Sequence, residues 1–451
     1  LTSPYLQFYV AATGIWLSGT SANTLLIRLP FALFAVTGVW ISWFIFRKLK
    51  YPLFTLFLYS LSLSTSVQLY LYWRQARHYA LQFPLSLGYL YGYLNLQKPR
   101  GIIMFLIFGV LLYHAYYPAF FSFTAAIAIH AAVRKVFDKK YNLRPLIFSC
   151  LALAAVNAPA FFYLRHFGQL PNNGYLKTLA AYLMDLNYFG YFKVAVISLA
   201  TVVVLKRFDL GRSDLKKFKR LFHSHHYSLS LFLMVIISHL LLASFGAHNQ
   251  RYISVLIPYL FLLAAISWET LTQALTRLIR LNVNFVKIVS LPALFLLVSY
   301  SHPKFIQELQ AFTQELRNDY YGPIEGIVNT ISNVEGLKRI DPNLPKQPKT
   351  LIATNFEDGA IYSYLDNQFL NSLAPTDQYK YGDRLPDWVI IRKHWGQEEY
   401  LNSFLQTGNY EKIVTEYCDL PYENVYLVRT HRFQTPSDCP EGKLILYRLI
   451  K

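Results

Sequence analysis

Three basic side chains that suit phosphate binding lie close together in the stretch Tyr72-Trp73-Arg74-Gln75-Ala76-Arg77-His78-Tyr79. Arg74 precedes Arg77 by three positions and His78 by four, so all three would share one face of a helix. A guanidinium group is permanently charged and offers planar, paired donors to phosphate oxygens, and the imidazole adds another donor. This spacing predicts a phosphate-binding site. The alternative is that both arginines extend to lipid headgroups at a membrane interface.

The hydrophobic pattern indicates the elements that position these side chains. A helix that crosses a bilayer needs about 20 mostly apolar residues. Residues 3–18 are apolar but end in a Gly/Ser/Thr cluster, which favours a helix in the membrane interface. Ten further apolar segments are candidate spans: 25–46, 51–71, 78–96, 101–116, 117–133, 145–164, 193–206, 228–245, 252–270 and 285–302.

The basic residues between these segments fall into two alternating sets of loops. One set holds 20 of the 27 Lys and Arg residues in positions 1–302. Cytoplasmic loops are enriched in Lys and Arg, so we expect this set to be cytoplasmic. With ten spans, residue 1 and everything after residue 302 then lie outside. The 20 basic residues lie within 47–50, 98–100, 134–144, 206–220 and 277–287.

This arrangement places the Arg74–His78 stretch on the outer side, together with several other polar and aromatic groups. A lone histidine near a helix end is usually just solvated, but several such groups on one side could line a site for an anionic headgroup. Those that we expect to support the site are Tyr79, His114, Tyr117, Arg165 and Tyr252.

Carboxylates are scarce in the same region, which restricts the chemistry. Transfer to a hydroxyl or amine generally uses a carboxylate to accept a proton or to hold a metal ion. Positions 1–302 contain five acids, and Asp185 is the only one expected on the outer side. Asp185 is therefore the candidate catalytic acid, unless the C-terminal region or a segment before Leu1 supplies it. His223, His225 and His226 have no acid nearby, so we interpret them as part of a basic loop and expect no metal site.

Charge also marks a boundary between two domains. Residues 1–302 carry a net charge of about +22, whereas residues 303–451 carry about −4. The region 303–340 is polar and is expected to be helical. Short apolar runs at 350–354, 388–391, 425–428 and 444–447 predict strands, with a helix or loop near 398–406.

The predicted fold class is therefore mostly α: a polytopic transmembrane helical bundle of about ten spans (1–302) with a small extracytoplasmic α/β domain (303–451). In an oxidising compartment Cys418 and Cys439 could pair, which would stabilise the domain by about 3 kcal/mol. The alternative is two unrelated thiols. The overall charge of +18 does not indicate nucleic-acid binding, because the basic residues lie between apolar runs as the positive-inside rule expects.

Four short motifs occur in order along the first 302 residues. They are Thr2-Ser3-Pro4-Tyr5-Leu6 continuing into Phe8-Tyr9, Arg28-Leu29-Pro30, Arg77-His78-Tyr79-Ala80-Leu81, and Arg251-Tyr252 followed by Pro258. In this pattern residues 1–302 resemble the membrane glycosyltransferases of the GT-C fold. The nearest branch is the protein mannosyltransferase and lipid A aminoarabinose transferase group, glycosyltransferase family 39. The motifs are short and do not specify a substrate.

The resemblance implies a polyprenyl-phosphate-linked sugar as donor and transfer at the outer face of the membrane, with inversion at the anomeric carbon. It assigns Arg77 and Arg251 to the carrier phosphate, supported by Arg74 and His78. The acceptor, a lipid, glycan or protein, stays unknown. The family's catalytic acid lies before the stretch matching Pro4-Tyr5, so the resemblance predicts that this chain is N-terminally truncated and lacks the acid and one span.

Gln75 stands where many relatives carry Glu, which weakens an acid or metal role for that position. The missing carboxylate would either deprotonate the acceptor or orient a divalent ion. We expect a multi-pass protein of a bacterial inner (plasma) membrane. Two other functions stay open: a polysaccharide polymerase or ligase that uses a lipid-linked donor, and a lipid or glycan transporter without enzymatic activity.

Overall fold

The computed structural model describes residues 5–18, 24–73, 77–164, 174–188, 190–207, 229–245, 250–302, 304–317, 322–336, 350–355, 368–371, 384–392, 398–420, 439 and 442–450. The chain divides into two compact units. Leu1–Ala12 and Arg28–Gln307 form the first, called here the helical unit. Thr13–Ile27 and Glu308–Lys451 form the second, called here the sheet unit.

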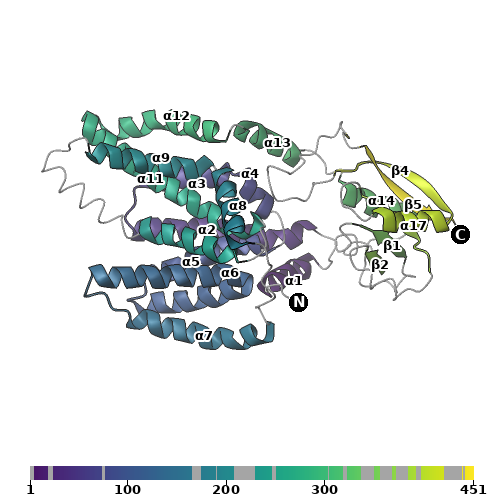
Figure 1. Ribbon diagram of the computed structural model, residues 1–451, viewed down its shortest axis with the longest axis horizontal. Coiled ribbons are helices and arrows are strands. Elements are labelled where there is room, and N and C mark those ends of the chain that lie inside the picture. The colour runs from purple at the N-terminus through teal and green to yellow at the C-terminus, as the bar shows by residue number, and fades with distance from the viewer. Residues whose placement is uncertain are drawn as a thin grey trace. The chain divides into compact units, whose positions relative to one another are not determined.

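The helical unit is built from helices that lie side by side (Figure 1). All ten apolar segments predicted from the sequence fall on helices. Among the described residues, five helices are long and apolar enough to cross a membrane, or six if a bent pair forms one span, so the count of ten spans stays a prediction. The helices begin with α1 (Leu6–Ser18), α2 (Thr24–Lys48), α3 (Leu53–Ser64), α4 (Val67–Trp73), α5 (His78–Leu94), α6 (Pro99–Phe137) and α7 (Arg144–Leu164). They continue with α8 (Tyr175–Tyr188), α9 (Gly190–Arg207), the helix Leu229–Ala243, the 3₁₀ helix η1 (Gln250–Leu256), α11 (Ile257–Ile279) and α12 (Val283–Ser301).

The predicted span 51–71 is not one straight helix, because α3 and α4 meet at an angle of 66°. The bend falls in a cluster of Ser and Thr residues, whose hydroxyls compete with the backbone for hydrogen bonds. Thr65 donates its hydroxyl proton to the carbonyl of Leu61, while Ser66 Oγ accepts from the amide of Leu69 at the start of α4. Local hydrogen bonding thus ends one helix and begins the next.

Helix α6 reverses direction at Tyr116, where the backbone leaves the helical region (φ −164°, ψ 92°). A straight helix of 39 residues would measure about 58 Å, roughly twice the hydrocarbon thickness of a bilayer. The Tyr89 ring of α5 instead packs against both Phe105 and Phe120, one from each half. The two halves therefore lie side by side, as expected for the predicted segments 101–116 and 117–133. Pro118 favours the break because it has no amide proton to donate.

Helices α5 and α11 form the centre of the unit and are almost wholly buried. Close packing depends on small residues: a Cβ atom at Gly92 of α5 would lie 2.5 Å from the backbone nitrogen of Phe105. Helices α2, α7 and α12 lie outside them and expose large apolar side chains, such as Trp40, Leu151 and Leu296. Contiguous apolar surface of this kind suits lipid better than water.

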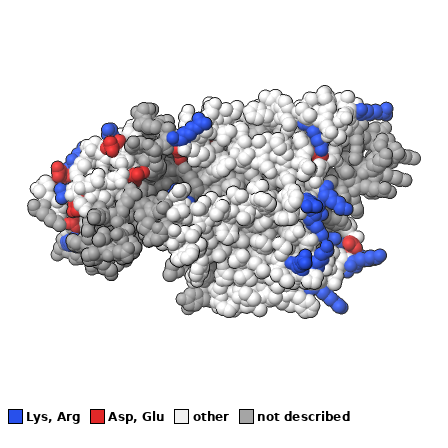
Figure 2. Space-filling model, turned by 180° about the vertical axis from the view of Figure 1, so that it is seen from behind, with Lys and Arg blue, Asp and Glu red and all other residues white. Residues whose placement is uncertain are grey.

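The described basic loops gather at one end of the helical unit, where Figure 2 shows most of its Lys and Arg side chains. Lys48, the last residue of α2, lies within electrostatic range of Lys98, which precedes α6, and of Arg134 in the last turn of α6. Gln97 donates a hydrogen bond to the carbonyl of Asn142, and Lys287 of α12 lies over the ring of Phe54 in α3. Loops that are distant in sequence but were predicted to share one side therefore lie together.

The sheet unit contains a five-stranded mixed sheet in the order β2-β1-β3-β5-β4. Strands β2, β1 and β3 are parallel, and β5 pairs antiparallel with β3 and β4. The sequence predicted β1, β3 and β5, and a helix or loop where α17 lies, but not β2 or β4. The run at 425–428 lies outside the described residues. The elements are α13 (Phe305–Arg317), α14 (Pro323–Glu335), β1 (Leu351–Thr354), β2 (Gln368–Asn371), β3 (Trp388–Ile390), α17 (Glu398–Thr407), β4 (Tyr410–Cys418) and β5 (Lys443–Leu449).

Each face of this sheet is covered by a helix. Ile327 and Ile331 of α14 pack with Trp388 on one face, and Leu401 of α17 packs with Val389 on the other. A buried ion pair follows the carboxyl ends of β3 and of the edge strand β4, with Arg392 Nε 2.6 Å from Asp419 Oδ1. The adjacent Cys418 forms the predicted disulfide with Cys439. The disulfide thus fixes the chain next to that ion pair.

Candidate functional site

Segments that are distant in sequence bring a histidine and several tyrosines together in the helical unit. The His78 ring stacks on Tyr116 with centroids 5.1 Å apart and an interplanar angle of 12°. Tyr116 also stacks on Tyr252 at 6.5 Å, and His78 contacts Tyr79 at 4.3 Å. Tyr182 lies within electrostatic range of Tyr116. These five residues, His78, Tyr79, Tyr116, Tyr182 and Tyr252, are called the aromatic cluster below.

Local structure positions each member of the cluster. His78 is the first residue of α5, after an extended Arg77 (φ −132°, ψ 169°). Its backbone amide donates to Gln7 Oε1 at 3.1 Å, and its ring Nδ1 lies 3.3 Å from the same oxygen. The reversal of α6 places Tyr116 against this helix end. Short 3₁₀ backbone before Pro258 of α11 holds Tyr252 in place.

A buried histidine that the sequence analysis did not single out fixes the position of η1. His239 Nε2 lies 2.7 Å from the carbonyl oxygen of Tyr252, and Nδ1 lies 2.7 Å from Ser122 Oγ. A carbonyl oxygen only accepts, so Nε2 carries a proton. His239 therefore connects the second half of α6 to the residue that completes the cluster.

Asp185 lies in α8, a helix that the sequence analysis did not predict. Its side chain is buried, with 7% of the residue exposed. It follows Tyr182 by three positions, so both residues lie on the same face of α8. Because Tyr182 is close to Tyr116 and α8 packs against η1, the structure brings this carboxylate near the aromatic cluster. The sequence predicted an outward-facing loop carboxylate, and the structure instead buries it against neighbouring helices.

The other predicted site residues differ in what the structure shows. Arg77 is exposed beside His78. Tyr117 is half-buried and lies within electrostatic range of Tyr252, so it borders the cluster. The described ring contact of His114 is with Tyr113, at 5.3 Å. Arg74 and Arg165 lie outside the described residues, as does the side chain of Arg251, whose backbone belongs to η1.

The arrangement combines three chemical features. Aromatic rings provide flat apolar walls, the tyrosine hydroxyls and the His78 ring can donate or accept hydrogen bonds, and Arg77 supplies a permanent positive charge next to them. Asp185 supplies a negative charge nearby. Within the described parts of the chain, no group of three or more His, Cys, Asp or Glu residues could hold a metal ion.

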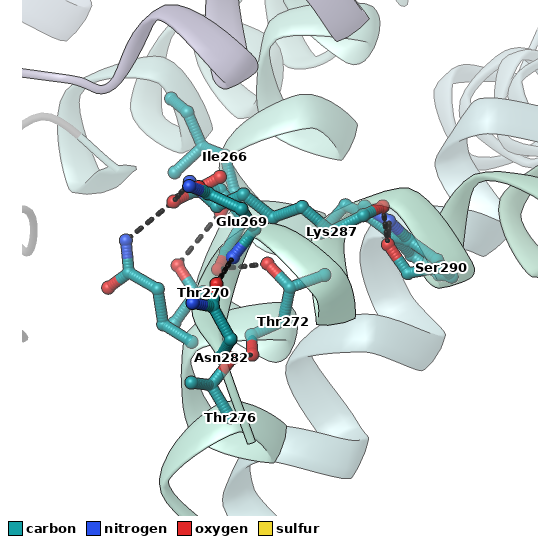
Figure 3. A network of polar contacts seen from close by, with 11 residues as sticks. Ile266, Glu269, Thr270, Thr272, Thr276, Asn282, Lys287 and Ser290 are labelled. Atoms are coloured by element: carbon teal, nitrogen blue, oxygen red, sulfur yellow. Dashed lines mark hydrogen bonds and ion pairs between the residues drawn. The ribbon is translucent and has the colours of Figure 1, made fainter. Parts of the chain in front are cut away.

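A second polar network lies toward the basic end and joins α11 to α12 (Figure 3). Lys287 Nζ lies 2.8 Å from Glu269 Oε1, and the two side chains are 14% and 4% exposed. Gln273 Nε2 donates to the same carboxylate oxygen at 2.6 Å, and Trp268 donates to Ser290 Oγ at 3.2 Å. The structure buries Glu269 in α11 with a basic partner. Its contacts indicate a role in joining helices.

Comparison with protein families, curated proteins and solved structures found no match to this chain.

Proposed function

We propose that this chain is a membrane glycosyltransferase that moves a sugar from a polyprenyl-phosphate carrier to a lipid, glycan or protein acceptor. The observation that supports this most strongly is the aromatic cluster. His78 and Tyr79 meet Tyr252 across more than 170 positions of sequence, with Tyr116 between them. These contacts bring together the two arginine-containing motifs, at 77–79 and 251–252, on which the resemblance to GT-C enzymes rests.

The proposed reaction breaks the bond between the anomeric carbon and a phosphate oxygen. The bonding electron pair leaves with the carrier phosphate, so negative charge develops on that oxygen. Arg77, together with Arg251 of η1, stabilises this charge by the electrostatic principle of an oxyanion hole. The acceptor oxygen or nitrogen forms the new bond and loses its proton to a carboxylate. Asp185 is the candidate among the described residues.

The aromatic rings suit a lipid-linked sugar. Sugar rings and prenyl chains both present apolar C–H surfaces to flat side chains, while the tyrosine hydroxyls can bond to sugar hydroxyls. Polar and cationic groups placed among apolar helices are costly, so their gathering at one location favours a functional site over an incidental one.

Two independent observations support the proposed orientation. The gathered Lys and Arg residues mark the cytoplasmic end of the helical unit. Helix α12 starts at that end, where Lys287 meets Phe54, and one crossing brings the chain to the opposite side before α13. The Cys418–Cys439 disulfide belongs to the part of the chain that follows, and disulfides persist in oxidising compartments outside the cytoplasm. We therefore place the protein in the plasma (inner) membrane with the sheet unit outside.

The phosphate assignment is tested by replacing Arg77 with Ala in the full-length protein and measuring binding of polyprenyl phosphate by the ligand-induced rise in melting temperature. Hydrogen bonds to a charged group contribute about 1.5–3 kcal/mol. Binding should therefore weaken about 10- to 150-fold, and transfer from a mannosyl or aminoarabinosyl carrier should fall with it. Arg77→Lys should recover part of the binding, because it keeps the charge but not the paired donors.

Arg100→Ala is the matched control, because Arg100 is exposed in the first turn of α6, at the basic end, and should not contact the carrier. It should bind and transfer like the wild type. Unchanged binding by Arg77→Ala would refute the role of Arg77. A wild-type protein that binds neither carrier nor glycosylated carrier would refute the proposed function itself.

A further inference from the structure

One face of α5 carries polar side chains along the length of the helix. His78, Gln82 and Ser86 follow one another at intervals of four residues, and Tyr89 and Tyr93 continue the series. Residues spaced this way share a helix face. The face is buried in the centre of the helical unit rather than directed to solvent.

Four of these five side chains have partners on other segments. His78 stacks on Tyr116, and Ser86 Oγ accepts a hydrogen bond of 2.9 Å from the Tyr259 hydroxyl of α11. Tyr89 bonds to Thr124 at 3.0 Å and Tyr93 to His130 at 2.7 Å, both in the second half of α6. These bonds connect α5 to its neighbours, as polar groups between membrane helices commonly do.

Gln82 is the exception. It is 1% exposed, and neither Nε2 nor Oε1 has a hydrogen-bond partner among the described residues. Leaving a buried polar group unsatisfied costs about 1–3 kcal/mol, so native structures normally satisfy such groups with water or a ligand. Gln82 lies four residues, about 6 Å along the axis, beyond His78, so it is the next polar residue after the aromatic cluster on this face of α5.

The chemistry of the amide indicates what it binds. Nε2 only donates and Oε1 only accepts. Fully ionised phosphate oxygens accept hydrogen bonds but do not donate them, so a phosphate could satisfy Nε2 alone. A prenyl chain has no hydrogen-bonding groups and could satisfy neither atom. A hydroxyl group both donates and accepts. Vicinal hydroxyls of a sugar ring could therefore satisfy both ends of the amide at once.

We propose that Gln82 binds the sugar of the lipid-linked donor, with its amide bonded to ring hydroxyls while Arg77 holds the phosphate at the entrance of α5. This inference rests on the proposed function and assigns a second part of the donor to a second residue. Gln82 is then a determinant of sugar binding, separate from the phosphate contact.

The test compares Gln82→Met with the wild type, using the full-length protein and two probes. The first probe is polyprenyl phosphate, and the second is the same lipid carrying mannose or aminoarabinose. Methionine keeps the length of the side chain and removes both hydrogen-bonding ends. The glycosylated lipid should bind about tenfold more weakly to the variant, in line with a hydrogen-bond contribution of 0.5–1.5 kcal/mol, while binding of polyprenyl phosphate should not change. Arg77→Ala should weaken binding of both probes.

Asn157→Leu is the matched control, because the Asn157 amide in α7 is also buried without a partner among the described residues, and α7 packs against α6. It should bind both probes like the wild type. If Gln82→Met does not reach the membrane in folded form, Gln82→Asn, which retains a shortened amide, should show the same selective loss in weaker form.

Equal affinity of wild type and Gln82→Met for the glycosylated lipid would overturn the inference and indicate that ordered water satisfies the amide. Equal loss for both probes would also overturn it, since Gln82 would then act on the shared carrier. Either result leaves the proposed function intact. Failure of the wild type to bind either probe would overturn the proposed function together with this inference.

Discussion

Buried polar side chains do two different jobs in the helical unit. His239 and the Glu269–Lys287 pair join helices, because each has partners on a second element. Gln82 has no such partner among the described residues, and it follows the aromatic cluster. A buried polar group without a described partner is therefore a candidate ligand contact where it also lies next to the aromatic cluster, as Gln82 does and Asn157 of α7 does not.

Removing one charge of the Glu269–Lys287 pair should destabilise the protein more than removing both. Lys287→Met leaves a buried carboxylate with Gln273 as its remaining described partner, and breaking a buried ion pair in this way costs about 3–5 kcal/mol. The double variant Glu269→Leu, Lys287→Met removes both charges, so it should be closer to wild type than Lys287→Met. The free energy of unfolding in bicelles measures both effects, with exposed Lys177→Met as control. If the loss in free energy of unfolding of the double variant equals the sum of the losses of the two single variants, the two charges do not stabilise each other.

At the level of single residues, the sequence identified several members of the aromatic cluster but not the buried polar residues near it. His78, Tyr79 and Tyr252 could be found because they flank arginines at expected membrane boundaries. Gln82 and His239 could not, since an amide or imidazole within an apolar run gives no sign of which neighbours surround it. The spacing of His78, Gln82 and Ser86 was a usable signal, because it is the spacing of one helix face.

The helices themselves were predictable where apolar runs were long, and the break in α6 was predictable from its proline. The reversal of α6 follows from Tyr116-Tyr117-Pro118, and the bend between α3 and α4 falls on a Ser/Thr cluster that the predicted span 51–71 overlooked. Helix α8 was missed because its apolar residues alternate with Lys177, Asp185 and other polar groups. Strand β4 was missed because it has charged residues at several positions and lies at an edge of the sheet.

The order of the helices makes a prediction about sidedness. We expect a cysteine introduced at Lys140, between α6 and α7, to react with a membrane-impermeant maleimide only after the cells are permeabilised. Cysteines at Lys177 of α8 and at Glu399 of α17 should react in intact cells. All three positions are exposed, and the background is Cys150→Ser with the disulfide retained. The reverse labelling pattern would contradict the proposed orientation.

At the scale of the whole molecule, the uneven distribution of charge anticipates the two-part organisation. Five acids against 27 basic residues in positions 1–302 are typical of helices embedded in lipid, and the acidic remainder forms a sheet covered by helices on both faces. The sheet order and the packing of α14 and α17 depend on contacts between distant segments. Sequence periodicity cannot reveal these contacts, whereas net charge and span length can be read directly.

The proposed function depends on a lipid phosphate that binds where α5 begins, beside Tyr116 and Tyr252. Its most direct test is photocrosslinking of the full-length protein in membranes with a polyprenyl phosphate that carries a diazirine next to the phosphate, followed by mapping of the modified residues. The account predicts adducts within 77–82, 116–117 and 251–252, and their loss in Arg77→Ala. Adducts confined to the exposed faces of α2, α7 and α12, and unchanged by Arg77→Ala, would contradict it.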